Sequence, residues 1–428
     1  MLPKSALSLT AILLLSVTSA EAMKFETLGY KSVSMGGAAV ASSSGSHAAY
    51  NNPALLAQQP YAVEVSLGAG VSATDHGAGA AYSKLSDNGF FDLMDSASTD
   101  ISAITTEEGK VLADSKNIFL GMNENGIALA PQAYLGAQVY AFGFGVYESS
   151  DVLATTIIDQ THDQLIFEDG PSYTKIEDDG TKTTGISQAE YDATAIQYAM
   201  DNGDTYINAV GIAIAEVPLA YGHNFETKLG NIMVGGAIKY MHAITYIQDL
   251  TFEDSEDDGE KFDKQSSNFG IDLGLAYQPS FSYDLTFGLV GKNLNSPTFD
   301  FYTGSEYKLD PMVRAGVAYN ITESLQVASD IDLTSNTSLY DGFESQMLGG
   351  GIIYEPFSSI FALSLRGGLM QNLHSSDVAG LTYTAGLGIG VKWFQIDLSG
   401  EMASKTNEIE GTSVPQYAKA TLALISRW

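Results

Sequence analysis

Leu381-Thr-Tyr-Thr-Ala-Gly-Leu-Gly-Ile-Gly-Val-Lys-Trp393 alternates larger apolar residues with small or polar ones at every step. A period of two places the two sets on opposite faces of a β-strand, each facing a different environment. The same alternation recurs over residues 271–278, 313–319 and 325–333. The sequence therefore predicts an all-β protein. A soluble β-sandwich produces the same alternation, so the pattern alone leaves two architectures open.

The lengths of the connections between these strands separate the two architectures. Short connections alternate with long ones when the chain is followed back from its carboxyl end. The short ones lie near residues 393, 355–359, 320–323, 278–282 and 225–230, and the long ones span 404–415, 371–380, 335–345, 293–311, 248–266 and 151–205. Tight turns at one end and long loops at the other are typical of an outer-membrane barrel. We therefore predict a closed antiparallel transmembrane β-barrel.

The predicted number of strands depends on residues 61–82. If they form one long strand the chain has about fourteen strands, whereas a hairpin there gives an odd total. Bacterial barrels made from one chain use even strand numbers, which favours the single strand. Twelve or sixteen strands are the alternatives.

Aromatic residues gather beside the short connections, and both tryptophans of the chain, Trp393 and Trp428, belong to this set. Aromatic rings favour the headgroup level of a membrane, so we expect these two residues to anchor the barrel at one interface. The last strand, residues 417–428, ends on an aromatic residue. We expect the barrel-assembly machinery to recognise it.

The composition excludes several classes of function. The 428 residues include 51 Asp or Glu and 20 Lys or Arg, giving a formal net charge of −31. Nucleic-acid binding is not expected, because phosphate contacts need a basic surface. The absence of cysteine excludes a disulfide framework and thiolate catalysis. No apolar run approaches the roughly 18 residues of a transmembrane helix.

Residues 1–22 are interpreted as a cleaved secretory signal. Lys4 supplies the positive segment, residues 6–17 the apolar core, and Ala20-Glu21-Ala22 the cleavage site. A barrel with such a signal belongs in the outer membrane of a Gram-negative bacterium. There we expect it to contact lipid and lipopolysaccharide.

Residues 23–60 do not alternate and are rich in small side chains, so we predict a plug inside the barrel formed by residues 61–428. The plug contains Met-Gly-Gly-Ala at 35–38, a small polar run, and Asn-Pro-Ala-Leu-Leu-Ala at 52–57. This pattern resembles the amino-terminal hatch of the long-chain fatty acid transporter (FadL-like) family of outer-membrane barrels. The resemblance implies about fourteen strands, a hatch and an outer-membrane location.

Two later motifs are similar to the branch of that clan described as conjugal transfer protein TraF. One runs through Gly-Lys-Asn-Leu-Asn-Ser-Pro-Thr-Phe at 291–299, Tyr-Lys-Leu-Asp-Pro at 307–311 and residues 314–319. The other is Ala-Ile-Ala-Glu-Val-Pro-Leu-Ala-Tyr at 213–221. The chain lacks the cysteines of a thioredoxin-like conjugation factor, so the resemblance does not by itself imply a direct role in DNA transfer.

The strongest functional candidate is Asn52-Pro53-Ala54, together with Gly36 and Gly37 in the same predicted plug. In the transporter family the matching triplet lies in the hatch and takes part in gating. Proline fixes the backbone, and an asparagine side chain bonds to backbone groups, so few contacts hold the plug. The alternative is a plain turn that ends the plug.

Arg314 and Arg366 face the lumen by strand parity, and the chain has three arginines in all. Either one would suit a substrate carboxylate, because arginine binds carboxylates in a bidentate manner. The favoured alternative is a charge network with inward aspartates, since charges inside a barrel need partners. The candidate partners are Asp272, Asp330, Asp332 and Asp397.

The long loops carry weaker signals. Residues 249–263 are acidic and faintly similar to a calcium loop, but Gln265 occupies the position where glutamate is required, so no metal site is predicted. A solvated acidic loop is the favoured interpretation, with weak divalent bridging to lipopolysaccharide as an alternative. Loops 84–130 and 151–205 have partly amphipathic segments that predict helices. These helices would form an apolar entry site or simply pack over the rim.

No catalytic motif such as Gly-x-Ser-x-Gly or His-Glu-x-x-His occurs, and no cofactor is predicted. We therefore expect a non-enzymatic protein. The first hypothesis is a passive, plug-gated channel for hydrophobic small molecules. The alternative is a non-transporting barrel that serves as an accessory or scaffold of a secretion or conjugation apparatus.

Overall fold

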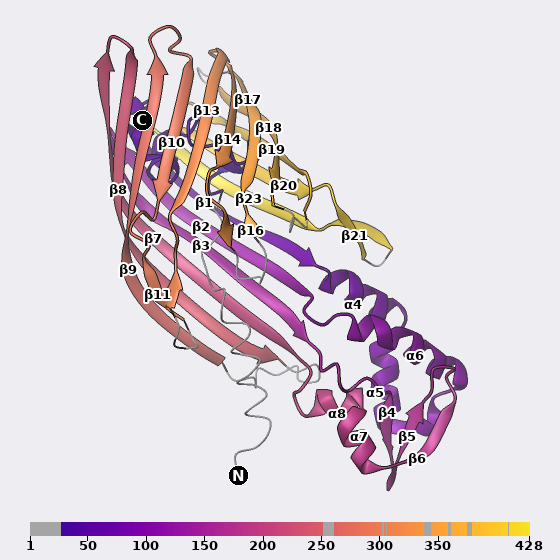
Figure 1. Ribbon diagram of the computed structural model, residues 1–428. Helices are drawn as coiled ribbons and strands as arrows, with labels where there is room; N and C mark the ends of the chain where they lie inside the picture. Colours follow the sequence, from indigo (N-terminus) through magenta and orange to yellow (C-terminus); the bar gives the residue numbers. More distant parts are fainter. Residues whose placement is uncertain are drawn as a thin grey trace.

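The structure is a computed structural model that describes residues 27–250, 261–301, 304, 306–337, 344–357, 361–374, 379–409 and 411–428. Fourteen antiparallel strands close into one barrel, in which each strand pairs with the next barrel strand along the chain and β23 pairs back with β1 (Figure 1). The strands are β1 (Val63–His76), β2 (Gly126–Val139), β3 (Phe142–Ile157), β7 (Tyr206–Thr227), β8 (Gly230–Leu250), β9 (Lys261–Pro279), β10 (Leu285–Lys292), β13 (Met312–Thr322), β14 (Leu325–Asp332), β17 (Met347–Phe357), β18 (Phe361–Asn372), β19 (Thr382–Val391), β20 (Phe394–Ala403) and β23 (Tyr417–Arg427). The predicted barrel and its strand number are confirmed.

The first strand is single, as parity required, but it is shorter than the sequence indicated. β1 ends at His76, and the helix α4 (Ala78–Asp87) contains Tyr82. Gly77 lies between them with a φ of 99°, a backbone conformation that glycine adopts without strain. The alternating pattern of residues 61–82 therefore overestimates the strand.

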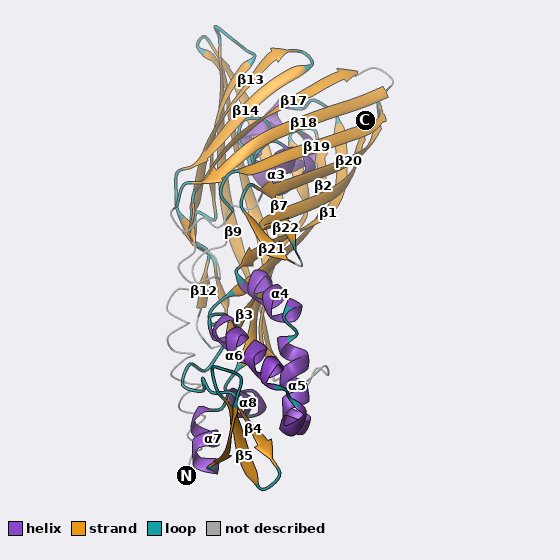
Figure 2. Cartoon of the chain, turned by 90° about the vertical axis from the view of Figure 1, so that its right-hand side faces the viewer, coloured by secondary structure: helices purple, strands orange, loops and turns teal. Residues whose placement is uncertain are grey.

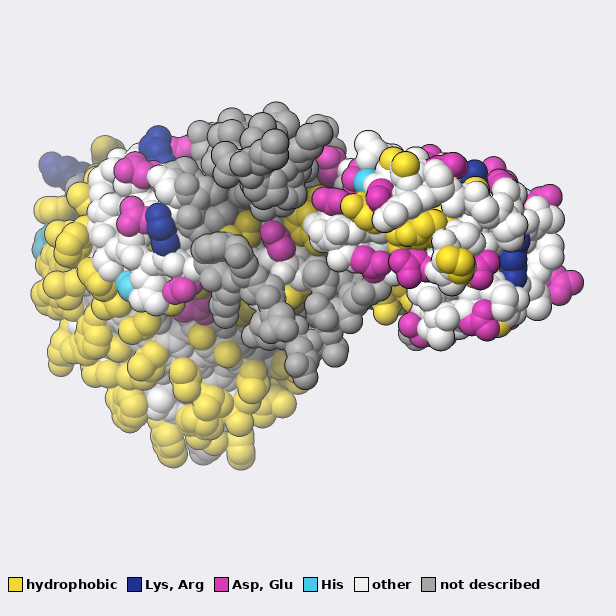
Figure 3. Space-filling view, turned by 90° about the horizontal axis from the view of Figure 1, so that it is seen from below, with side chains coloured by type: hydrophobic (Ala, Val, Ile, Leu, Met, Phe, Trp, Pro, Cys, Tyr) yellow, Lys and Arg dark blue, Asp and Glu magenta, His cyan; other side chains and the backbone are white. Residues whose placement is uncertain are grey.

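The outer surface of the barrel is apolar. Outward residues of β19 such as Tyr383, Leu387 and Ile389 are exposed, whereas Thr382 and Thr384 on the opposite face are buried. Figure 3 shows a broad band of apolar side chains along the side of the barrel. An exposed apolar surface of this extent fits contact with hydrocarbon, and barrel closure satisfies the strand backbone without water. Among the helices in the described part of the chain, none is long and apolar enough to cross a membrane.

The aromatic residues near the short connections lie where the sequence placed them. Trp393 lies in the link between β19 and β20, and Trp428 follows the last strand. Both side chains are exposed, as are Phe281 and Phe361 at neighbouring connections of the same end. These positions are compatible with interfacial anchoring, which stays a prediction.

The two longest connections form a separate outer lobe at the opposite end of the barrel (Figures 1 and 2). The lobe consists of α4, α5 (Phe90–Asp100), η3 (Ile101–Ala103), α6 (Thr106–Leu120), β4 (Ile166–Asp169), β5 (Ser172–Ile176), β6 (Lys182–Ile186), α7 (Gln188–Thr194) and α8 (Ile196–Asp201). The predicted helices of these loops are confirmed, although residues 126–130 and 151–157 belong to strands. Phe90 and Met94 are buried in the core of the lobe, where they pack against Phe119 and Phe167.

The remaining long connections carry small hairpins, namely β11–β12 (Thr298–Asp300, Glu306–Lys308), β15–β16 (Asn336–Thr337, Glu344–Ser345) and β21–β22 (Thr406–Ile409, Thr412–Pro415). The predicted acidic loop 249–263 is shorter than expected, because β8 extends to Leu250 and β9 begins at Lys261. Its central residues, 251–260, lie outside the described residues. The predicted signal, 1–22, and the first four residues of the predicted plug also lie outside them.

Candidate functional site

The segment from residue 27 to residue 60, called the plug below, lies inside the barrel (Figure 2). It contains α2 (Tyr30–Ser34), η1 (Gly45–His47), α3 (Ala48–Asn51) and η2 (Pro53–Gln58). Nearly every residue from Leu28 to Leu56 is buried. Such short elements cannot bury a core of their own, so the barrel wall supplies their packing partners.

The backbone of the plug approaches the wall most closely at glycines. A Cβ atom on Gly36 would lie 2.3 Å from the carbonyl oxygen of Leu369, and its φ of 63° also favours glycine. The Gly36 N–H donates to Thr384 Oγ1 at 3.0 Å. Gly37 follows with a φ of 80°. Both glycines of the predicted motif therefore lie in the plug, and Gly36 contacts the wall.

The wall is also built from inward-facing glycines where it meets the plug. A Cβ on Gly349 of β17 would lie 1.9 Å from the oxygen of Gly36, and one on Gly288 of β10 would lie 2.4 Å from the oxygen of Val40. Further wall glycines whose added Cβ would meet plug atoms within 3 Å are Gly143, Gly222, Gly235, Gly274, Gly351, Gly368 and Gly386. The plug is thus in direct contact with much of the barrel's circumference.

The Asn52-Pro53-Ala54 triplet joins the plug to itself and to the wall. Asn52 Oδ1 accepts a hydrogen bond from the Ala54 N–H at 3.1 Å, which begins η2 with Pro53 in its first turn. Asn52 Nδ2 donates to the carbonyl oxygen of Val40 at 2.7 Å and to that of Leu275 on β9 at 3.3 Å. The residue-level contacts fit the predicted role in holding the plug, and the gating role stays a prediction.

Asp330 is a plug contact that sequence reasoning placed elsewhere, as a partner of arginine. Its Oδ2 accepts hydrogen bonds from the backbone N–H groups of Ala39 and Val40 at 2.7 and 2.8 Å. Asp330 lies on β14, and a carboxylate that accepts two backbone donors is a strong, charge-assisted contact. Strand parity indicated that this residue faces inward, but not which luminal segment lies opposite it.

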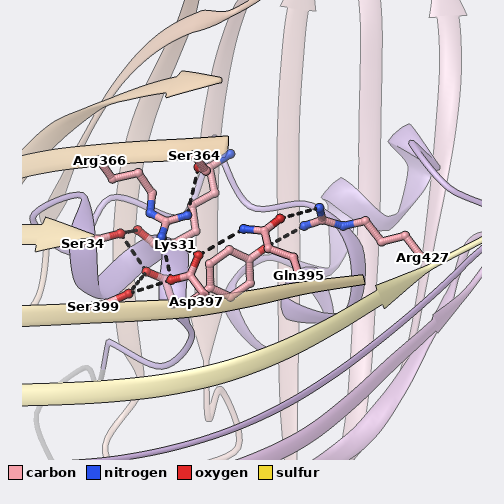
Figure 4. Close-up of polar contacts among 9 residues, drawn as sticks. Lys31, Ser34, Ser364, Arg366, Gln395, Asp397, Ser399 and Arg427 are labelled. Atoms are coloured by element: carbon pink, nitrogen blue, oxygen red, sulfur yellow. Dashed lines mark hydrogen bonds and ion pairs between the residues drawn. The ribbon is translucent and has the colours of Figure 1, made fainter. Parts of the chain in front are cut away.

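Arg314 and Arg366 are both buried and both paired with aspartates. Arg314 Nε donates to Asp332 Oδ1 at 2.5 Å. Arg366 Nη2 lies 2.6 and 2.5 Å from the two carboxylate oxygens of Asp397. Figure 4 shows these two side chains facing each other. The predicted charge network therefore accounts for both arginines. These ion pairs favour it over an open carboxylate site.

The Arg366 pair also holds the first helix of the plug. Ser399 Oγ donates to the carbonyl oxygen of Tyr30 at 2.8 Å and lies 3.1 Å from Asp397 Oδ1. The Arg366 guanidinium lies 5.2 Å from the centre of the Tyr30 ring. Removing either charge would therefore disturb the wall and the plug together.

The junction between β1 and β23 forms a second buried contact with the plug. Arg427 Nε pairs with Glu64 Oε2 at 2.9 Å, and Arg427 Nη2 donates to the hydroxyl of Tyr30 at 2.7 Å. Glu64 Oε1 accepts from the Ser46 N–H at 2.9 Å. This contact was not predicted from the sequence, although the parity that places Trp428 outward also places Arg427 inward.

His47 is the titratable group at the centre of this contact. Its ring packs edge-on against Tyr30 and Tyr134, at centroid distances of 5.2 and 4.8 Å. Burial lowers the pKa of His47 to about 4; the nearby Glu64 opposes that change and Arg427 adds to it. The imidazole is therefore neutral in the plugged barrel at neutral pH.

A layer of charged side chains lies between the plug and the outer lobe. Lys239 Nζ is 2.9 Å from Glu216 and 3.1 Å from Asp272. Asp272 Oδ1 also accepts the N–H of Asn293 at 2.8 Å, and all of these side chains are buried. Lys292 lies 3.3 Å from the centre of the Tyr50 ring of the plug. This layer separates the plug from an apolar cluster farther out along β7 and β8.

The sequence matches a family model over residues 49–332, and the family is described as the F plasmid transfer operon TraF protein. The chain belongs to this TraF family. The resemblance to the TraF branch is thereby confirmed. No curated protein sequence matches the chain.

Several solved structures with a similar fold are described as hydrocarbon channels or toluene transporters. The P. putida toluene transporter TodX matches with a TM-score of 0.51 at 12% identity, covering 95% of this chain and 99% of that one. A TodX monoaromatic hydrocarbon channel mutant, deltaS2, gives 0.53 at 12% identity and covers 95% and 100%. The Ralstonia pickettii toluene transporter TbuX gives 0.50 at 14% identity and covers 94% and 98%. At such identities the likeness establishes a shared barrel fold.

Proposed function

We propose that this TraF-family barrel is a channel for small hydrophobic molecules in the outer membrane of a Gram-negative bacterium. It would reach that membrane by a cleaved signal and the barrel-assembly machinery, among outer-membrane lipid and lipopolysaccharide. Passage would be passive and would require the plug to move. The shared fold with hydrocarbon channels supports this proposal.

The observation that carries the proposal is the plug itself. It lies in the lumen of a closed barrel, and within the described chain its covalent link to the wall is the short stretch leading to β1. Its contacts are small apolar side chains and hydrogen bonds, some of them to members of buried ion pairs within the wall. Hydrogen bonds contribute about 0.5–1.5 kcal/mol each, because water can replace the partner that is lost. A segment held in this way can shift without the barrel unfolding.

The order of the luminal layers determines which surfaces an entering molecule would contact first. Apolar side chains of β7 and β8 lie toward the outer lobe, the Glu216–Lys239–Asp272 layer follows, and the plug comes next. An apolar molecule that enters from outside would meet favourable surface first and charged groups second. The charged layer would oppose its further passage, so opening must rearrange this layer together with the plug.

The test removes the plug and then only one of its contacts. Deleting residues 24–57 is expected to raise the permeability of proteoliposomes to small solutes and the uptake of an apolar fluorescent compound. Asp330→Asn, which weakens the bonds to Ala39 and Val40, is expected to give a smaller increase. Asp114→Asn, which weakens the exposed pair with Lys110 on α6, is the matched control. Unchanged permeability and uptake in the deletion variant would count decisively against the channel.

A second candidate is an accessory or scaffold barrel of a secretion or conjugation apparatus. The extent of the wall glycines in contact with the plug favours it, because a plug matched so closely to the wall also suits a permanently closed barrel. The outer lobe offers a polar surface rich in acidic side chains (Figure 3). Mass spectrometry of the protein purified in mild detergent separates the two candidates. A bound lipid or hydrocarbon supports the channel, and a reproducible protein partner supports the scaffold.

A further inference from the structure

The segment between β10 and β13 folds back into the outer part of the barrel as the β11–β12 hairpin. Four of its side chains are almost completely buried, namely Phe299, Phe301, Tyr307 and Leu309. They pack against an apolar wall surface formed by Ile212 and Ile214 of β7 and Met241 and Ala243 of β8. The TraF-branch motif at 291–299 and 307–311 therefore encodes a luminal hairpin whose largest side chains cover the wall.

This hairpin is not a strand of the barrel. β11 pairs with β12 alone, in a two-stranded sheet separate from the barrel. Side chains of the wall bind its backbone: Asn268 Nδ2 donates to the Thr298 oxygen at 2.9 Å, and the Asp300 N–H donates to Ser266 Oγ at 2.9 Å. Contacts of this kind are fewer and weaker than a continuous strand ladder. The hairpin can therefore detach while every barrel strand keeps its partners.

The base of the hairpin, by contrast, is fixed to the wall. β10 ends at Lys292, so the edge of β9 beyond that point needs other partners. Asn295 supplies them: its Oδ1 accepts the Ile271 N–H at 2.9 Å, and its Nδ2 donates to the Phe269 oxygen at 2.7 Å. A fixed base followed by the weakly attached strand β11 is the construction of a hinged element. The Leu309 N–H closes the base on the oxygen of Pro297 at 2.9 Å.

We propose that the β11–β12 hairpin is a lid over the apolar binding surface of the channel. When the lid opens, an uncharged apolar molecule about the size of an aromatic ring takes the place of the Phe299 and Tyr307 side chains. This inference rests on the proposed function and locates its binding site. The wall surface fits rings, because two aromatic rings occupy it in the closed state. The charged layer of Glu216, Lys239 and Asp272 bounds it on the plug side, which confines the ligand to the apolar part.

The proposal has a quantitative consequence. Lid and ligand compete for one surface, so the apparent affinity equals the intrinsic affinity multiplied by the fraction of molecules with an open lid. Holding the lid closed must weaken binding, and loosening it must strengthen binding. A hairpin that is merely structural would change neither.

The experiment exploits the absence of cysteine in the chain. A Ser266→Cys/Asp300→Cys pair places two thiols where the wall meets the hairpin, and oxidation locks the lid. The control pair, Asn407→Cys/Val414→Cys, joins directly paired residues of the β21–β22 hairpin. Binding of N-phenyl-naphthylamine is measured by fluorescence on full-length protein in amphipol, oxidised and then reduced. Phe299→Ala loosens the lid in a third variant.

We expect the locked lid to lower the affinity at least tenfold, reduction to restore it, and the control pair to have no effect. Phe299→Ala is expected to raise the affinity several-fold. Equal binding by the oxidised and reduced Ser266/Asp300 pair overturns the lid, as does the absence of probe binding in every variant. Uptake of the same probe into proteoliposomes is measured in parallel. Lock-sensitive binding without uptake supports the lid and contradicts the channel, whereas uptake that persists with the lid locked contradicts only the lid.

Discussion

The barrel encloses two segments, the plug and the β11–β12 hairpin, and the wall holds them by different means. The plug meets the wall through glycines, alanines, backbone hydrogen bonds and buried charges such as Asp330 and Glu64. The hairpin meets it through large apolar side chains, above all Phe299 and Tyr307. Changes in charge and pH should therefore move the plug, and apolar ligands should move the hairpin.

The largest effect is expected from breaking the ion pair behind α2. Asp397→Ala leaves the buried Arg366 without its carboxylate and should lower the free energy of unfolding by roughly 3–5 kcal/mol, because an unpaired buried charge is costly. The thermal unfolding midpoint in detergent measures this loss. Asp114→Ala, which removes an exposed ion pair with Lys110 on α6, should leave the midpoint unchanged. A stable Asp397→Ala variant would show that the plug does not depend on this pair.

Acid should loosen the plug through His47. Its pKa is about 4 in the folded barrel, below the ordinary value of 6.5, so between those pH values the unfolded segment binds more protons. The contribution of neutral His47 to the free energy of unfolding is therefore fully present above about pH 6.5. It falls by up to roughly 3 kcal/mol as the pH drops toward 4. Limited proteolysis of the plug across this range is the measurement. His47→Gln should remove most of the pH dependence; an unchanged profile would assign the dependence to other titratable groups.

The close approach of backbone to backbone predicts a steric effect of moderate size. Gly349→Val would place a side chain on the position of the Gly36 oxygen and should destabilise the plugged state by roughly 1–3 kcal/mol. We expect faster proteolysis of the plug and higher conductance in planar bilayers. Gly367→Val on the outward face of β18 is the control, because the nearest atom, the Thr384 oxygen, is 3.8 Å from its added Cβ. Equal behaviour of the two variants would mean that the wall glycines do not position the plug.

The barrel could be predicted from the sequence, whereas the contacts of the plug and the hairpin could not. Period-two patterns and loop lengths predicted the barrel and its fourteen strands, because a strand's two faces are read directly from parity. Parity also placed Arg314, Arg366 and Asp330 inside. It gave no height along the barrel axis, since strand tilt and register decide which inward residues share a level. The plug contact of Asp330 and the Arg427–Glu64 contact depend on that height, as does the hairpin against β7 and β8.

The smallest predicted effect compares one hydroxyl in each region. Within the described residues the buried hydroxyl of Tyr307 has no hydrogen-bond partner, whereas the Tyr147 hydroxyl donates to the plug oxygen of Ser46 at 2.7 Å. Tyr147→Phe should therefore cost about 1 kcal/mol, while Tyr307→Phe should be neutral or slightly stabilising, because it removes a buried polar group that gains nothing. Thermal midpoints of the two variants, measured side by side, decide the matter. If the two variants lose the same stability, the Tyr307 hydroxyl has a hydrogen-bond partner, as the Tyr147 hydroxyl does. The distinction between the plug contact and the hairpin contact then no longer holds.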